Sequence, residues 1–158
     1  MSCKVAGFLQ EKNLNPHSFI GICLPTCMEY IAAEIGVWLA GHAIVPMGDN
    51  YPKERIDFIM KHCESPLLID KSLIDEILSI SSIQDYTLQD EDDINSIFYT
   101  SGSTGQPKGV IHTFATFRIP PSAESIVEEE GISTMGITAP MYFIACKLLY
   151  AILLKGGK

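Results

Sequence analysis

The sequence predicts an α/β fold with a mostly parallel sheet flanked by helices. Two observations predict it. Short apolar runs of strand length alternate with segments of helical period, and the first two such runs enclose one helix. The chain has 158 residues, 47% of them hydrophobic and 19% charged, which is enough to bury one core. A single domain is therefore expected over residues 1–158.

The expected elements follow one another along the whole chain. They are a helix over 3–12, a strand over 18–24, a helix over 28–39, a strand over 43–47, a helix opened by Pro52, a strand over 66–70, a helix over 73–80, a strand over 94–100, an exposed acidic helix or turn over 122–130 and a buried helix over 141–154.

The first elements are indicated by residue spacing and by residues typical of helix ends. Val5, Phe8 and Leu9 share one face of the first helix. Thr26 and Glu29 have the spacing of a capping box at the start of the second helix. The apolar face expected for that helix consists of Met28, Ile31, Ile35, Trp38 and Leu39. Gly41 follows where a helix ends, and the next apolar run completes a strand–helix–strand unit, which requires parallel strands.

The later elements rest on weaker but consistent signals. Pro52 suits the first turn of a helix because its missing N–H needs no partner there. The run 66–70 is short and apolar, and strand-forming residues return over 94–100 after a polar connection. Pro140 and Lys147 interrupt the most apolar stretch, 139–154, which is shorter than the ~20 residues that span a bilayer. It is interpreted as core, and no membrane association is expected.

Charge and cysteine usage exclude further classes of protein. There are 11 Lys and Arg residues against 19 Asp and Glu, a net charge of −8, so nucleic acid should be repelled. The five cysteines are scattered, without the spacing of a metal site or a redox pair. The first ten residues lack the pattern of a signal peptide. A cytoplasmic protein with free, buried thiols and no metal-binding residues is expected.

The most informative segment is the loop that follows the strand over 94–100. Small residues let a backbone approach an anion closely, glycines allow its N–H groups to turn inward, and hydroxyls and a lysine add donors and charge. The candidate phosphate-binding residues are Thr100, Ser101, Gly102, Ser103, Thr104, Gly105 and Lys108, with Tyr99 as a fifth hydroxyl. A Walker A loop is excluded because Pro107 stands where that motif has glycine. The alternative interpretation is a flexible Ser/Gly-rich loop.

This loop, over 100–109, resembles the signature of the AMP-forming adenylate ligases: acyl-CoA synthetases, luciferases and the adenylation domains of nonribosomal peptide synthetases. The segments 39–46 and 51–56 are similar to an earlier motif of that family, in a form closest to the amino-acid adenylation domains. A third likeness, over 139–157, covers an aromatic motif and a helix that ends at Gly-Gly. The resemblance extends over nearly the whole chain.

The resemblance implies a reaction. Enzymes of this family use ATP and Mg²⁺ to convert a small carboxylic acid to an acyl-adenylate, releasing pyrophosphate, and pass the acyl group to a thiol of CoA or of carrier-protein phosphopantetheine. The loop residues would then hold the β and γ phosphates, with Lys108 as the catalytic charge beside them. The acid is left open, because neither the His of acyl-CoA synthetases nor the Asp of amino-acid adenylation domains is found near Phe143.

Several family motifs do not occur in these residues: the Tyr-Gly-x-Thr-Glu segment with its metal-binding Glu, the ribose-binding Thr-Gly-Asp and the C-terminal lysine-bearing domain. The sequence is therefore expected to be an incomplete N-terminal subdomain, a partial AMP-binding (adenylation) domain over 1–158, inactive alone. Its partner would be the remainder of the enzyme, or other copies through open strand edges. The alternatives are a non-catalytic nucleotide- or pyrophosphate-binding module, such as a truncated pseudoenzyme, and the product of a broken reading frame.

Two further candidates remain open at this point. The acidic run 90–93 could bind a divalent cation or could be a solvated turn before a strand. His112 could contact phosphate or substrate, or could simply alternate along the strand that follows the loop.

Overall fold

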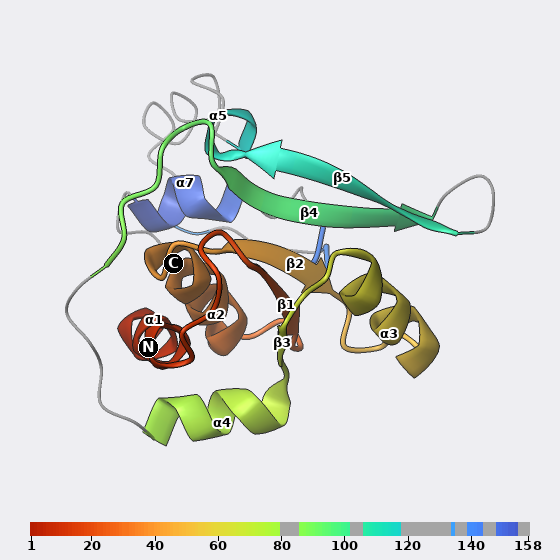
Figure 1. Ribbon diagram of the computed structural model, residues 1–158, viewed down its shortest axis with the longest axis horizontal. Helices are drawn as coiled ribbons and strands as arrows, with labels where there is room; N and C mark the ends of the chain where they lie inside the picture. Colours follow the sequence, from red (N-terminus) through yellow and green to blue (C-terminus); the bar gives the residue numbers. More distant parts are fainter. Residues whose placement is uncertain (80–85, 102–105, 118–133, 135–138, 144–147, 155–158) are drawn as a thin grey trace.

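The computed structural model describes residues 1–79, 86–101, 106–117, 134, 139–143 and 148–154. Its centre is a five-stranded sheet in the order β3-β1-β2-β4-β5 (Figure 1). The strands are β1 (Phe19–Cys23), β2 (Ala43–Met47), β3 (Leu67–Ile69), β4 (Ile94–Ser101) and β5 (Pro107–Thr113). Strands β1 to β4 are parallel and β5 is antiparallel to β4. The expected mostly parallel α/β fold is confirmed.

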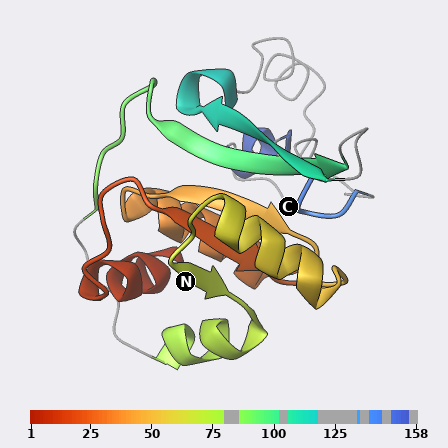
Figure 2. The ribbon, with the colours of Figure 1, turned by 45° about the vertical axis from the view of Figure 1, so that its right-hand side comes forward.

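Helices cover both faces of this sheet (Figures 1 and 2). They are α1 (Ser2–Glu11), α2 (Met28–Leu39), α3 (Lys53–His62), α4 (Lys71–Ser79), α5 (Phe114–Phe117) and α7 (Leu148–Leu154). Because side chains alternate along a strand, the sheet has two separate apolar cores. Ile20, Ile22 and Ile44 pack with α1, α2, α4 and α7, whereas Val45 and Met47 pack under α3.

Helix α2 differs from the expectation in its cap and in its buried face. Its N-cap residue is Cys27, and no side chain bonds the first-turn amides, so the predicted capping box does not form. Tyr30, Ala33 and Val37 are fully buried, while Met28 is 65% exposed. The cause is α1, which packs along α2 so closely that small residues of α2 must face it.

The closest approach of α1 and α2 is at Gly36. A Cβ atom there would lie 2.4 Å from the Cβ of Val5 and 2.7 Å from the carbonyl oxygen of Ser2. We expect Gly36→Ala to lower the free energy of unfolding by about 1–3 kcal/mol, because α1 must move away. Urea unfolding tests this. Unchanged or higher stability, as alanine's helix propensity alone would give, would contradict the packing.

The carboxyl-terminal part also differs from the expected helix over 141–154. Residues 140–143 form a turn, in which the amide of Phe143 donates to the carbonyl of Pro140 at 3.0 Å, and α7 is described from Leu148. Met141 and Ile152 are buried, as expected of core residues. The helix or turn expected over 122–130 lies outside the described residues. Within the described ranges, no helix is both long enough and apolar enough to cross a membrane.

Candidate functional site

The parallel strands bring several loops to one edge of the sheet. The carboxyl ends of β1, β2, β3 and β4 all lie at this edge, and the arrows of β2 and β4 point to the same side in Figure 1. In open α/β sheets, this carboxyl edge is where ligands bind. Strand β4 ends there with Thr100 and Ser101, immediately before the predicted phosphate loop. The next four predicted residues, Gly102, Ser103, Thr104 and Gly105, lie outside the described residues.

Thr100 and Lys108 are brought together by the β4–β5 hairpin. They are directly opposite in the antiparallel register, so both side chains lie on the same face. Both are exposed. A hydroxyl and an ammonium group side by side, without another partner among the described residues, suit the oxygens of a phosphate. The described residues therefore fit the polyphosphate end of a nucleotide.

Magnesium has no comparable set of ligands in the described part of the chain. There, no group of three or more His, Cys, Asp or Glu side chains converges as a metal site would require. A Mg²⁺ ion held largely by phosphate oxygens and water is compatible with this, since Mg²⁺ needs few protein carboxylates in such sites.

Tyr99 lies apart from the other residues of the predicted phosphate loop. Its register partner is Gly109, and its ring lies on the α3 face, away from Thr100. The Tyr99 hydroxyl shares a hydrogen bond with Nδ1 of His62 at 2.7 Å. Burial, together with the nearby Cys63 thiol, raises the pKa of Tyr99 to about 12. The alternation of a strand thus separates this hydroxyl from its neighbours in sequence.

Gly109 has a packing role in the same hairpin. A Cβ atom on Gly109 would lie 2.8 Å from Cγ2 of Ile97 and 3.3 Å from Cζ of Tyr99. The glycine therefore leaves room for the Tyr99 ring on this face of the hairpin.

A cavity of about 420 Å³ lies at the same carboxyl edge. It is formed by the turns after β1 and β2 and by the segment 139–143, and its lining residues are Leu24, Thr26, Asp49, Asn50, Ala139, Pro140 and Tyr142. Gly48 is needed for this arrangement, because a Cβ there would lie 2.8 Å from the Tyr142 ring. Sequence reasoning missed the cavity. The available signal was the turn 48–50, which directly follows a buried strand.

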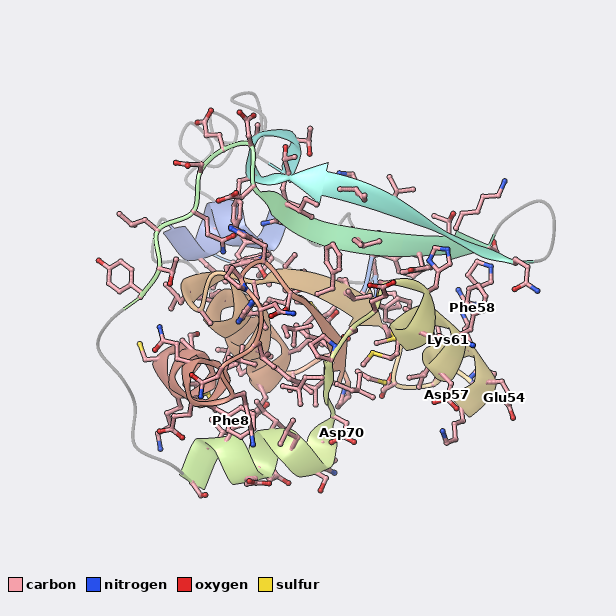
Figure 3. The ribbon with its side chains drawn as sticks, viewed as in Figure 1. Phe8, Glu54, Asp57, Phe58, Lys61 and Asp70 are labelled. Carbon is pink, nitrogen blue, oxygen red and sulfur yellow. The ribbon has the colours of Figure 1, made fainter. Side chains whose placement is uncertain are left out.

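Aromatic contacts fix the wall of this cavity. The Tyr142 ring meets the Tyr51 ring edge-on, with centroids 5.3 Å apart, and the Arg55 guanidinium lies 4.0 Å from the centroid of Tyr51. On the exposed side of α3, Lys53 and Asp57 form an ion pair one helical turn apart (Asp57 is labelled in Figure 3).

Cys23 lies at the carboxyl end of β1, where its surroundings favour the protonated thiol. Burial raises the pKa of the Cys23 thiol, and the nearby carboxylates of Asp49 and Asp70 raise it further (Asp70 is labelled in Figure 3). The protonated thiol donates to the carbonyl oxygen of Gly48 at 3.5 Å. Because the thiolate is the reactive form, the raised pKa makes this thiol a poor nucleophile at neutral pH. The expectation of buried thiols is confirmed for Cys63 and wrong for Cys3, which is exposed; Cys23 and Cys27 are partly buried.

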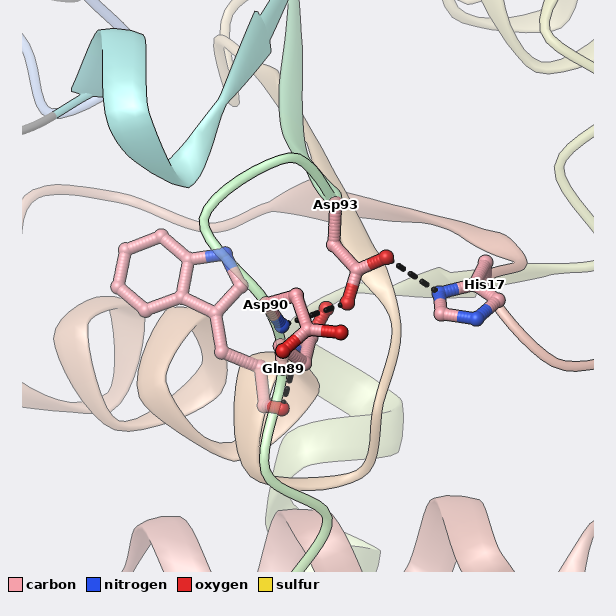
Figure 4. A network of polar contacts seen from close by, with 5 residues as sticks. His17, Gln89, Asp90 and Asp93 are labelled. Atoms are coloured by element: carbon pink, nitrogen blue, oxygen red, sulfur yellow. Dashed lines mark hydrogen bonds and ion pairs between the residues drawn. The ribbon is translucent and has the colours of Figure 1, made fainter.

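The acidic run and His112 both lie toward the opposite end of β4. Asp93 accepts from the amide of Asp90 at 2.8 Å and lies 3.9 Å from Nδ1 of His17, so the run forms a turn (Figure 4). This favours the solvated-turn interpretation. His112 pairs with Ser96, four residues and about 13 Å along β5 from Lys108. It packs on the Phe98 ring and is not placed to contact phosphate at the loop.

Sequence comparisons give a consistent set of similar proteins. A family model described as "AMP-binding enzyme" matches residues 1–158. The chain is 30% identical over 174 residues to surfactin synthase subunit 1 of Bacillus subtilis (strain 168), covering 98% of this chain and 5% of that protein. It is 35% identical over 125 residues to gramicidin S synthase 2 of Aneurinibacillus migulanus, covering 70% of this chain and 3% of that protein. The chain thus spans only a small part of these relatives.

Solved structures show the same fold. The N-terminal subdomain of Klebsiella oxytoca NpsA, in complex with 3-hydroxyanthranilyl-AMSN, matches with a TM-score of 0.78 and 22% identity, covering 99% of this chain and 43% of that one. The O-succinylbenzoate coenzyme A synthetase MenE of Bacillus subtilis, in complex with AMP, matches with a TM-score of 0.79 and 22% identity, covering 99% and 46%.

Proposed function

The chain belongs to the AMP-binding enzyme family, and from this premise we propose that it supplies the phosphate-binding part of an enzyme that activates a carboxylic acid with ATP. The observation that carries the proposal is the hairpin at the carboxyl edge, where Thr100 and Lys108 lie exposed on one face. The products would be an acyl-adenylate and pyrophosphate. Gly102, Ser103, Thr104 and Gly105 are proposed to add backbone amides and hydroxyls to the same site.

The chemistry assigns a clear task to these residues. A carboxylate oxygen attacks the α-phosphorus, a new O–P bond forms, and the bond to the bridging oxygen breaks, so negative charge grows on the leaving pyrophosphate. The Lys108 ammonium and the hydroxyls of Thr100 and Ser101 would stabilise that charge and orient the leaving group. When bound, Mg²⁺ supplies additional positive charge to the phosphate oxygens.

The acid and the thiol acceptor are proposed only by class. The synthases among the relatives favour an amino-acid-like substrate and a carrier-protein phosphopantetheine, whereas MenE favours CoA as the acceptor. Phe143, which is 51% exposed, packs beside the cavity residue Tyr142. It carries neither the carboxylate nor the imidazole that would indicate one class of substrate. We propose a cytoplasmic location, where ATP and both kinds of thiol are found.

Partner surfaces are proposed on the same basis. Strand β5 has no second neighbour among the described strands, and it exposes Val110 and Ile111 at 46% and 57%. An open edge with apolar side chains favours pairing with further sheet. The remainder of a longer enzyme or a second copy of the chain is the proposed partner.

Exchange of labelled pyrophosphate into ATP tests the activity. The 158-residue chain covers 43% and 46% of the two solved relatives, so we expect it to show background exchange with mixed amino and fatty acids. The longest natural polypeptide that contains it should show exchange that depends on one class of acid. Robust exchange by the 158 residues alone would contradict the proposal that they supply only part of the active site. Pyrophosphate binding without exchange in either polypeptide would favour the non-catalytic module.

A further inference from the structure

Helix α3 contacts Tyr99, the last buried residue of β4, which directly precedes the proposed phosphate site. The His62 ring stacks on Phe58, with centroids 5.6 Å apart and planes at 22°, and it meets the Tyr99 ring edge-on at 5.7 Å (Phe58 is labelled in Figure 3). The hydrogen bond between Nδ1 of His62 and the Tyr99 hydroxyl, 2.7 Å long, joins helix to strand. The Cys63 thiol also reaches the same hydroxyl.

The Tyr99 ring is buried, but packing does not enclose it on every side. A cavity of about 290 Å³ borders it, lined by Phe19, His62, Cys63, Glu64, Ile97, Tyr99, Gly109 and Ile111. A ring beside a void has fewer contacts on that side and can shift into it. The short hydrogen bond to His62 is therefore a directional contact that, together with the Cys63 thiol, helps to set where the Tyr99 hydroxyl lies.

The Tyr99 backbone is continuous with the site. The next two residues are Thr100 and Ser101, and the residue opposite Tyr99 is Gly109, which adjoins Lys108. A displacement of the Tyr99 ring would therefore move the peptides that carry both the hydroxyls and the ammonium group. Phosphate contacts depend on such placement to within a fraction of an ångström.

We propose that His62 is a positioning residue for the phosphate site: by holding the Tyr99 hydroxyl, it fixes the end of β4 that presents Thr100 and Ser101. The inference rests on the proposed function. His62 touches neither nucleotide nor acid in this role and acts through Tyr99. The two faces of the hairpin thus have different roles. One presents the proposed phosphate-binding groups, and the other packs against α3.

Two ring-conserving variants test the inference. His62→Phe and Tyr99→Phe each keep an aromatic ring and delete the hydrogen bond. We expect calorimetry to show that each weakens inorganic pyrophosphate binding by about fivefold, the effect of one hydrogen bond. The double variant should lose no more than Tyr99→Phe alone, because that variant already removes the hydroxyl that His62 contacts. Without ligand, the ¹⁵N amide signals of Thr100 and Ser101 should move in both variants.

Trp38→Phe is the matched control. It deletes the bond from Nε1 of Trp38 to the carbonyl of Asn95, 3.1 Å long, at the other end of β4. It should lower stability without changing pyrophosphate affinity or the Thr100 and Ser101 signals. Unchanged affinity in both His62→Phe and Tyr99→Phe would overturn the inference. If the wild-type chain does not bind pyrophosphate, the proposed function fails. The positioning of β4 by His62 is then judged by the Thr100 and Ser101 amide signals alone, and it fails if they do not move in His62→Phe and Tyr99→Phe.

Discussion

Replacing Lys108 with alanine is expected to weaken pyrophosphate binding by about ten- to a hundredfold, the usual range for one charge-assisted hydrogen bond. Lys108 is exposed and lies opposite Thr100, so its ammonium group can reach a phosphate that the Thr100 hydroxyl also contacts. The side chain has no partner within the described structure, so the free energy of unfolding should change little. Calorimetric titration at fixed ionic strength measures the loss.

Lys71→Ala provides the control with the same change in net charge. Lys71 is exposed at the start of α4, after β3 at the other edge of the sheet. Its removal should leave pyrophosphate binding within about twofold of wild type, because salt screens charges that lie beyond a Debye length. Equal losses in the two variants would show that only the general field of the protein attracts the anion, and would remove Lys108 from the site.

The stability of the chain is expected to fall as the pH rises from about 4.5 to about 8, because of Glu34. Burial raises the pKa of Glu34 on α2 to about 8, against the opposing effect of a hydrogen bond from the hydroxyl of Tyr150 on α7. Below pH 4.5, the carboxyl is protonated in both the folded and the unfolded chain. Between the two values only the unfolded chain ionises, so each pH unit costs roughly 1 kcal/mol.

Glu34→Gln should remove this dependence. The amide keeps a group that can accept from Tyr150, and it never ionises, so the variant should be more stable than wild type at pH 8 and similar to it below pH 4.5. Glu76→Gln on α4, where the side chain is exposed, makes the same chemical change as a control and should leave the pH profile intact. The urea unfolding midpoints of wild type and both variants at pH 5, 7 and 9 measure the pH dependence of stability. Parallel profiles for wild type and Glu34→Gln would contradict the assignment.

The alternation of apolar runs and helical spacing was enough to predict the parallel sheet, because βαβ units leave few topologies. The strand expected over 43–47 is β2 with the same bounds, and Gly41 has the positive φ of +82° that a helix end requires. The buried face of α2 could not be predicted. It depends on the approach of α1 at Gly36, and periodicity cannot report which of two apolar faces a neighbouring helix will cover.

The phosphate site itself stays a prediction, and only the placement of some of its residues can be compared with the sequence. The composition of the loop indicated a phosphate site, and the hairpin places Thr100 and Lys108 on one face, as such a site needs. The separation of Tyr99 from these residues follows from strand alternation and could have been foreseen. The contact with His62 could not, because 37 residues separate the two in sequence. The cavity beside Tyr142 likewise depends on tertiary packing.

The most direct test of the phosphate site is a titration of the ¹⁵N-labelled chain with inorganic pyrophosphate, followed by amide chemical shifts. The largest shifts are expected at Thr100, Ser101 and Lys108, at the carboxyl edge of the sheet. Signals near Ser96 and His112, at the other end of the hairpin, should stay in place. Shifts centred on that other end, or none at saturating pyrophosphate, would contradict the claim that this hairpin binds the phosphates of ATP.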